Sequence, residues 1–191
     1  MSKVKIGIVG AGSAGLFAAN EIGKASLNDI EITVFDAGPE IEKRICPQRG
    51  EYKCAKCNPC RIMSGVGGAG AFSSGILNLN KEIGGDLDAL CAKAFLSADE
   101  IIRNIDAFFV QNGAPDKVFD PYQNIEKLKE LKLKCAAADI KFIPIKQRLL
   151  GSQKTPEVIK SIQQFLESNF DVKIVPNKKV HSFDKSKTLY F

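Results

Sequence analysis

The feature that most constrains this chain is a glycine-rich loop that begins at its tenth residue. The loop has the pattern G-x-G-x-x-G and follows an apolar run that ends at Val9. Its residues are Gly10-Ala11-Gly12-Ser13-Ala14-Gly15. In this pattern the first glycine permits a tight turn, the second lets the backbone approach a pyrophosphate, and the third lets the next helix pack closely. The motif therefore predicts a strand over 3–9, a phosphate-binding turn and a helix over 13–24.

An acid follows the loop at the distance found in nucleotide-binding βαβ units. The run over 31–35 is rich in β-branched and aromatic residues and predicts a second strand, which Asp36 follows 21 residues after Gly15. A carboxylate there accepts hydrogen bonds from adenosine ribose hydroxyls, and the helix N-terminus attracts the phosphates. FAD and NAD share this pattern, whereas the acid disfavours NADP because it would repel the 2′-phosphate. A structural turn without a ligand is the remaining alternative.

The rest of the chain predicts further helices and strands around one irregular stretch. Residues 38–79 have no regular periodicity and are dominated by cysteine, glycine, proline and serine. A stretch of that length without periodicity is usually functional or disordered, and its cysteines and glycines favour a functional one. The elements expected after it are helices over 86–111 and 125–138, a strand over 139–145, a helix from Pro156 to 168 capped by Thr155, and strands over 172–175 and 179–183.

This order of elements predicts an α/β fold: a parallel sheet with flanking helices and a long Cys/Gly-rich insertion. We expect one combined domain in three parts. Residues 1–80 form the dinucleotide-binding βαβ unit with its Cys/Gly-rich loop, residues 81–150 a helical insertion, and residues 151–191 the continuation of the nucleotide-binding domain.

Four cysteines fall within fifteen residues in the pattern C-P-x6-C-x2-C-x2-C. They are Cys46, Cys54, Cys57 and Cys60. Two residues between ligands is the spacing with which a short loop wraps one metal ion or cluster. A [4Fe–4S] cluster, a structural zinc ion, a thiol–disulfide pair and four plain reduced thiols all remain open. Cys91 and Cys135 fall in expected helices and are predicted to be buried apolar side chains.

A second glycine-rich segment, over 63–75, follows the cysteines. Its five glycines permit backbone conformations that other residues rarely adopt, and we expect something flat or anionic to lie against it. Four features together resemble those of a known family. They are the first glycine loop, the element Arg44-x-Cys46-Pro47, the cysteine run and the motif Gly68-Ala69-Gly70-x-Phe72-Ser73. That family is the uncharacterised FAD-dependent dehydrogenases of bacteria and archaea, which resemble the glutathione-reductase-type NAD(P)/FAD-dependent oxidoreductases.

The resemblance implies a Rossmann-like FAD-binding domain of an oxidoreductase with a small-molecule substrate, and NAD(P)H as co-substrate. It implies that the whole first loop, with Ala11, Ser13 and Ala14, binds the pyrophosphate. Further implied cofactor contacts are Asp36, Ala37, Gly38 and Val180 on adenosine, Arg44 near the phosphates, and Gly67, Gly68, Ala69, Gly70 and Ser73 near the flavin. Relatives commonly have Asp-Gly-Lys-Leu where this chain departs at Ser74, Ile76 and Leu77, so an acid and a lysine are absent here.

Two parts of a complete flavoenzyme have no counterpart in this sequence. No late strand ends in Gly-Asp, because Gly85-Asp86 comes too early and is expected to cap the next helix. No second G-x-G-x-x-G encodes a nicotinamide domain. We therefore expect an amino-terminal portion, either a shortened chain or one part of a split enzyme whose second chain completes the flavin site. Rival interpretations are a cysteine-rich zinc or iron–sulfur module and an NAD-binding protein without flavin.

Composition excludes several other classes. Of the 191 residues 45% are hydrophobic and 26% charged, the balance of a soluble globular protein. No apolar run reaches the roughly 18 residues that a bilayer span needs, and no signal-peptide pattern occurs, so we expect a cytoplasmic protein with no membrane partner. The net charge of +5 comes from scattered lysines, and with few aromatic side chains it predicts no nucleic-acid partner. His181 is expected at the surface, not as a general base.

Overall fold

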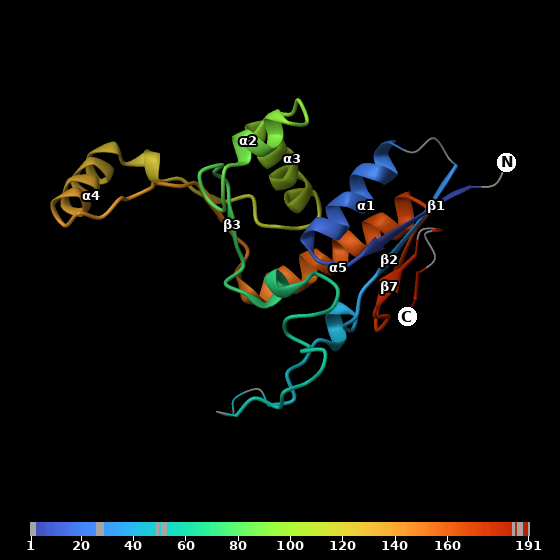
Figure 1. Cartoon of the computed structure of the whole chain (residues 1–191). Helices are drawn as coiled ribbons and strands as arrows, with labels where there is room; N and C mark the ends of the chain where they lie inside the picture. Colours follow the sequence, from blue (N-terminus) through green and yellow to red (C-terminus); the bar gives the residue numbers. More distant parts are fainter. Residues whose placement is uncertain are drawn as a thin grey trace. The chain divides into compact units, whose positions relative to one another are not determined.

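The computed structural model describes residues 3–25, 29–48, 50, 53–184, 186 and 189–190 (Figure 1). These residues form two compact units. The first unit comprises the described residues of 1–75 and 152–191, and the second comprises 76–151. Among the described residues no helix combines the length and the apolar character that crossing a membrane requires.

A three-stranded parallel sheet forms the centre of the first unit. Its strands β1 (Val4–Val9), β2 (Ile30–Phe35) and β6 (Val172–Val175) lie in the order β1-β2-β6. Val9 is in register with Phe35, and Phe35 with Val175, so the three strands end together. Every loop that leaves a carboxyl end of this sheet therefore begins at the same edge, which is where ligands bind in open α/β sheets.

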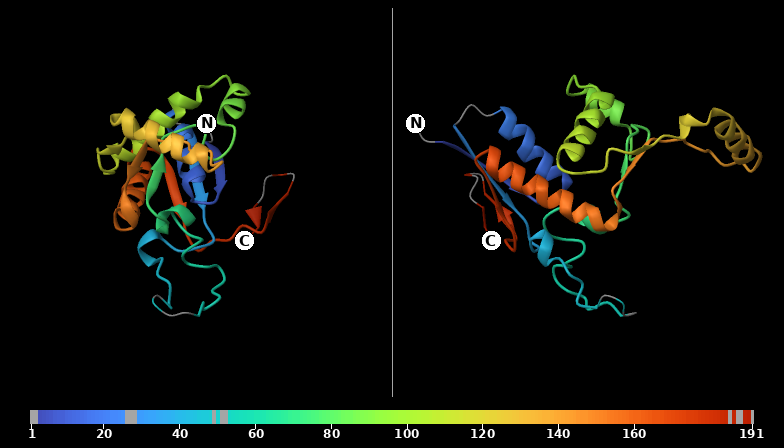
Figure 2. Two further views of the ribbon diagram at one scale, coloured as in Figure 1. Left: turned by 90° about the vertical axis from the view of Figure 1, so that its left-hand side faces the viewer. Right: turned by 180° about the vertical axis from the view of Figure 1, so that it is seen from behind.

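Two helices run side by side across the sheet, α1 (Ser13–Ala25) and α5 (Gly151–Asn169) (Figure 2). They approach closely, because a Cβ added to Gly23 of α1 would lie 2.6 Å from the Phe170 ring that follows α5. Alternate strand residues face the helices, as period-two geometry requires. The buried core consists of Ile32, Val34, Val172 and Ile174 from the strands and Leu16, Ala19, Val158, Ile162 and Leu166 from the helices. Full burial of each large aliphatic side chain contributes about 1.5–3 kcal/mol.

The second unit is built around a small antiparallel sheet. Its strands β3 (Ile76–Asn78), β5 (Gln147–Leu149) and β4 (Val118–Phe119) lie in the order β3-β5-β4, with helices α2 (Leu87–Ala92), α3 (Ala98–Gln111) and α4 (Ile125–Ala137). Arg148 on the central strand is 5% exposed and forms a two-point ion pair with Asp106 of α3, with N–O distances of 2.5 and 2.7 Å. This ion pair joins α3 to β5. The interaction with Asp106 raises the pKa of Arg148.

Short elements complete the described chain. They are 3₁₀ helices at Ile41–Lys43, Ala69–Phe72 and Pro121–Gln123, and an antiparallel pair of strands, β7 (Ser182–Phe183) and β8 (Leu189–Tyr190). The expected mixed α/β fold with a parallel sheet and flanking helices is confirmed, as are the first two strands and helices α1 and α4.

The single helix expected over 86–111 is wrong. The structure has α2 and α3 instead, separated at Phe95, whose φ of +56° no helix accommodates. The two sides are capped separately: Asp86 accepts from Ala89 N, as expected, and Ser97 accepts from Glu100 N. Ser97 is a good N-cap, so a second helix begins after it. Apolar periodicity alone therefore overestimated the length of the helix expected over 86–111.

Three further expectations about boundaries are wrong. The strand over 139–145 is not formed, and β5 begins at Gln147, beyond Pro144, which has no amide to donate to a ladder. Helix α5 begins at Gly151 and not with Thr155 as its cap, so Pro156 lies inside the helix. Of the strand over 179–183 only Ser182–Phe183 is formed, and it pairs with β8 while β6 pairs with β2.

Candidate functional site

The loop between β1 and α1 is held by two of its three glycines. Gly10 has a φ of +101°, a conformation that favours glycine, and its amide donates to Phe35 O at 2.7 Å. A Cβ added to Gly15 would lie 1.9 Å from Gly10 O, closer than any side chain could come. The backbone conformation therefore favours glycine at position 10, and packing against Gly10 O requires glycine at position 15.

Gly12 differs, because protein packing does not require it to be glycine. A Cβ added there would meet only Gly68 Cα, at 3.7 Å, an ordinary contact. The first helical hydrogen bond runs from Leu16 N to Gly12 O, so the amides of residues 13–15 have no acceptor within α1. A bare backbone corner beside helix-end donors suits a phosphate group. The residues present therefore fit the pyrophosphate that the loop pattern predicts.

Asp36 connects the carboxyl ends of β1 and β2. Its Oδ2 accepts from Ala11 N and its Oδ1 from Gly38 N, each at 2.8 Å, and the residue is 9% exposed. The chain after β6 lies beside it, since Lys178 N donates to Asp36 O at 2.7 Å and Asn177 N to Gly38 O at 2.8 Å. Each carboxylate oxygen has a second lone pair, which a ribose hydroxyl could use.

The second glycine segment lies directly against the first loop. Gly67 N donates to Ala11 O at 2.8 Å, and a Cβ added to Gly68 would lie 3.0 Å from Gly12 Cα. Gly68 also has a φ of +62°. The two segments that the sequence analysis assigned to the cofactor are thus brought together, although more than fifty residues separate them along the chain.

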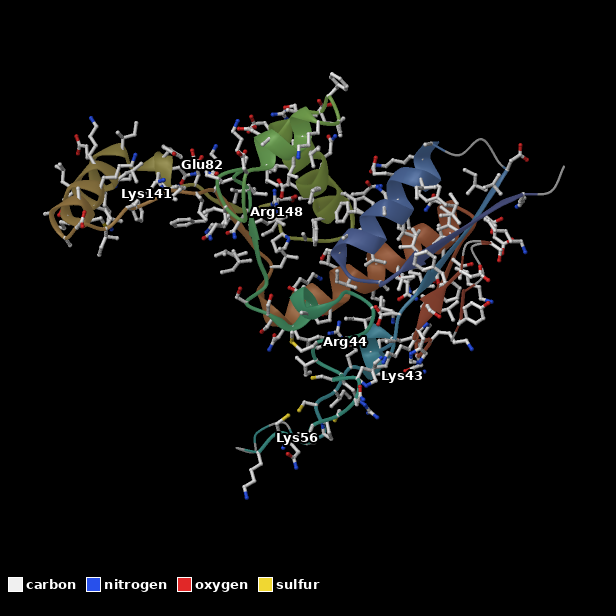
Figure 3. All side chains as sticks on the ribbon, in the orientation of Figure 1. Lys43, Arg44, Lys56, Glu82, Lys141 and Arg148 are labelled. Carbon is white, nitrogen blue, oxygen red and sulfur yellow. The ribbon has the colours of Figure 1, made fainter. Side chains whose placement is uncertain are left out.

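Arg44 holds the second segment in shape. Its side chain is 2% exposed and donates to four carbonyl oxygens: Arg61 O at 3.0 Å, Val66 O and Gly68 O at 2.8 Å each, and Ile62 O. The guanidinium also lies over the Phe72 ring, 4.7 Å from its centroid, and burial lowers its pKa. Arg44 is labelled in Figure 3. We expected Arg44 near the phosphates, whereas its donors are directed at loop carbonyls.

A pocket of about 350 Å³ opens beside Asp36 at the carboxyl edge of the sheet. It brings together five expected cofactor residues, Gly10, Asp36, Ala37, Gly68 and Val180. It adds seven residues that were not expected there: Val9, Phe35, Met63, Ser64, Gly65, Lys178 and Lys179. The run Lys178-Lys179-Val180 follows β6, so its position after a strand could have identified the two lysines.

Four expected flavin contacts do not line this pocket: Gly67, Ala69, Gly70 and Ser73. Ala69 and Gly70 belong to the 3₁₀ helix Ala69–Phe72, and both are exposed. Ser73 Oγ donates to Gly70 O at 2.9 Å. A Cβ added to Gly70 would meet nothing within 4 Å, so packing does not explain this glycine either.

The cysteines do not form a coordination site in this structure. All six are free thiols, with Cys54 and Cys60 exposed and the others half-buried, so the expectation that Cys91 and Cys135 are buried is wrong. Within the described chain no group of three or more His, Cys, Asp or Glu side chains could hold a metal ion. Amides of Ile62 and Met63 lower the pKa of Cys60.

His181 is exposed, as expected of a surface side chain, and its amide donates to Tyr190 O at 2.8 Å.

Comparison of the chain with models of protein families and with curated proteins found no match. Function is therefore inferred from the geometry of the glycine loop and its pocket.

The different surroundings of Gly12 and Gly15 predict opposite behaviour of their alanine variants. Gly15→Ala forces a Cβ against Gly10 O and should reduce the free energy of unfolding by about 2 kcal/mol or more. Gly12→Ala should leave stability within about 0.5 kcal/mol and instead abolish saturable binding of ADP. Urea unfolding and calorimetric titration with ADP measure the two effects. A Gly12→Ala protein that binds ADP as well as the parent would contradict this assignment.

The contacts of Arg44 predict that charge alone cannot replace it. In Arg44→Lys a single ammonium group cannot reach four carbonyls, so the second glycine segment should loosen and ADP affinity should fall about tenfold. Arg61→Lys is the matched control, because only the backbone oxygen of Arg61 takes part in this network. Equal ADP affinities of the two variants would show that Arg44 does not shape the pocket.

Proposed function

We propose that this chain binds FAD and forms the dinucleotide-binding portion of an FAD-dependent oxidoreductase with a Rossmann-like fold. The observation that carries this proposal is the bare corner at Gly12, next to the free amides at the start of α1. Packing does not demand a glycine at position 12, which lies at a helix N-terminus after the first strand. A phosphate that approaches the backbone accounts for this glycine.

The pocket beside Asp36 supports an adenosine moiety next to that corner. Its lining includes Asp36 and Ala37 together with the run from Lys178 to Val180. In this arrangement Asp36 would accept from the ribose hydroxyls while Val180 and Ala37 flank the adenine. The pocket volume of about 350 Å³ falls within the range of nucleoside-sized sites.

FAD, when bound, supplies hydride or electron transfer to a small-molecule substrate, with NAD(P)H as a further proposed co-substrate. The residues of this chain bind and orient it: the amides of residues 13–15 receive the pyrophosphate, and Arg44 positions the segment Gly67–Gly70. We assign no side chain a catalytic role. A reducing compartment such as the cytoplasm would keep the six free thiols reduced.

The free edge of β1 supports a second chain that completes the flavin site. In a doubly wound sheet the first strand is central, and the dinucleotide lies where the strand order reverses beside it. Here β1 is outermost in its sheet, and two of its apolar residues, Val4 and Val9, are 60% and 62% exposed. A further parallel strand along β1 would cover these side chains and supply the other half of the cofactor site.

The test compares FAD retention by Asp36→Asn and Asp29→Asn. Asp29 lies at the opposite end of β2, so its variant is the matched control. We expect the parent and Asp29→Asn to show the two-band visible spectrum of bound oxidised flavin after incubation with FAD and gel filtration. Asp36→Asn loses one acceptor and the charge, so its FAD affinity should fall at least about tenfold.

Circular dichroism of both variants checks that they remain folded. Equal retention of FAD by the two variants would contradict the proposed site. Retention of NAD but not of FAD by the parent would instead support the alternative that this chain is an NAD-binding protein without flavin.

A further inference from the structure

A second pocket of the first unit carries two cations, and no acid lines it within the described chain. It has a volume of about 370 Å³. It is lined by Lys43, Arg61, Asn177, Cys57 and Asn58, together with Pro39 and Pro59. None of these residues lines the pocket beside Asp36. This pocket is therefore distinct from the proposed FAD site.

We propose that this pocket binds the phosphate group of a small phosphate monoester or of free phosphate. A phosphate monoester has a second pKa of about 6 and is largely a dianion at neutral pH. Its two charges match the two cations of the lining, whereas a single carboxylate would leave one cation unbalanced. The planar guanidinium of Arg61 suits two-point binding of phosphate oxygens, and the Asn177 amide can donate a further hydrogen bond.

The backbone positions of the three polar residues are anchored. Lys43 ends the 3₁₀ helix Ile41–Lys43, where its amide donates to Glu40 O at 3.0 Å. Arg61 O accepts from the buried Arg44 at 3.0 Å. Asn177 has a φ of +55°, and its amide donates to Gly38 O at 2.8 Å. The polar side chains therefore start from fixed points around the pocket, which lowers the entropy lost on binding.

One acid competes with the proposed ligand. Glu40 Oε2 lies 3.0 Å from Lys43 Nζ, and both side chains are largely exposed, at 41% and 71%. An exposed pair of this kind contributes little stability, so a phosphate dianion can replace the carboxylate at low cost. Removal of the Glu40 charge should therefore strengthen binding, opposite in sign to removal of either cation.

The experiment is calorimetric titration of the purified protein at low salt with glycerol 3-phosphate and, separately, with inorganic phosphate. We expect saturable binding that Arg61→Gln weakens about tenfold, Lys43→Gln weakens severalfold and Glu40→Gln strengthens about twofold. Lys56→Gln is the control. Lys56 lies on the same loop, away from Lys43 (Figure 3), and does not line the pocket.

The two probes distinguish the sources of the phosphate. Tighter binding of glycerol 3-phosphate supports an ester that also contacts the prolines and Cys57, and equal binding supports free phosphate. The proposal is overturned if neither probe binds saturably, or if Lys56→Gln weakens binding as much as Arg61→Gln. Flavin retention measured on the same variants should stay unchanged, and its loss in the parent would refute the FAD site without bearing on this pocket.

Discussion

The arrangement of the site depends on the carboxylate of Asp36. Its two oxygens accept the amides of Ala11 and Gly38, so one side chain fixes the glycine loop after β1 against the turn after β2. Both hydrogen bonds are charge-assisted and nearly buried, and loss of the acid would leave two amides without acceptors. Asp36 also lines the pocket in which we propose that adenosine binds, so loop geometry and the proposed ligand recognition share one residue.

A buried arginine extends this organisation to the second glycine segment. Arg44 gathers the carbonyls of residues 61, 62, 66 and 68, which brings Gly68 to the first loop at Gly12. Those carbonyls would otherwise need other donors, because the segment is irregular and forms no ladder. In the described part of the chain the guanidinium is surrounded by these carbonyl oxygens and the Phe72 ring, and the charge of Asp36 also raises its pKa against the effect of burial. Arg44 therefore organises the second glycine segment, whereas we had expected it to contact a phosphate directly.

Local patterns predicted much of the first unit. The turn at Gly10, the helix from Ser13 and the position of Asp36 follow from rules of backbone geometry that act over a few residues. The break at Phe95 and the start of α5 at Gly151 depend on capping and tertiary packing, which periodicity does not report. The role of Arg44 could not be predicted, because its partners lie 17 to 24 residues away in a segment without regular structure. The position of Lys178 and Lys179 after a strand could be read from the sequence, but their approach to Asp36 depends on the parallel pairing of β6 with β2.

We propose that the corner at Gly12 and the pocket beside Asp36 form one continuous nucleotide site. An amide NMR titration of the folded protein with ADP, which carries both the adenosine and the diphosphate, tests this proposal. We expect the largest shifts on the amides of Gly12, Ser13 and Ala14 and on those of Gly38 and Val180, with one common affinity. Shifts that are absent from residues 12–14, or that fall mainly within 76–151, would contradict it.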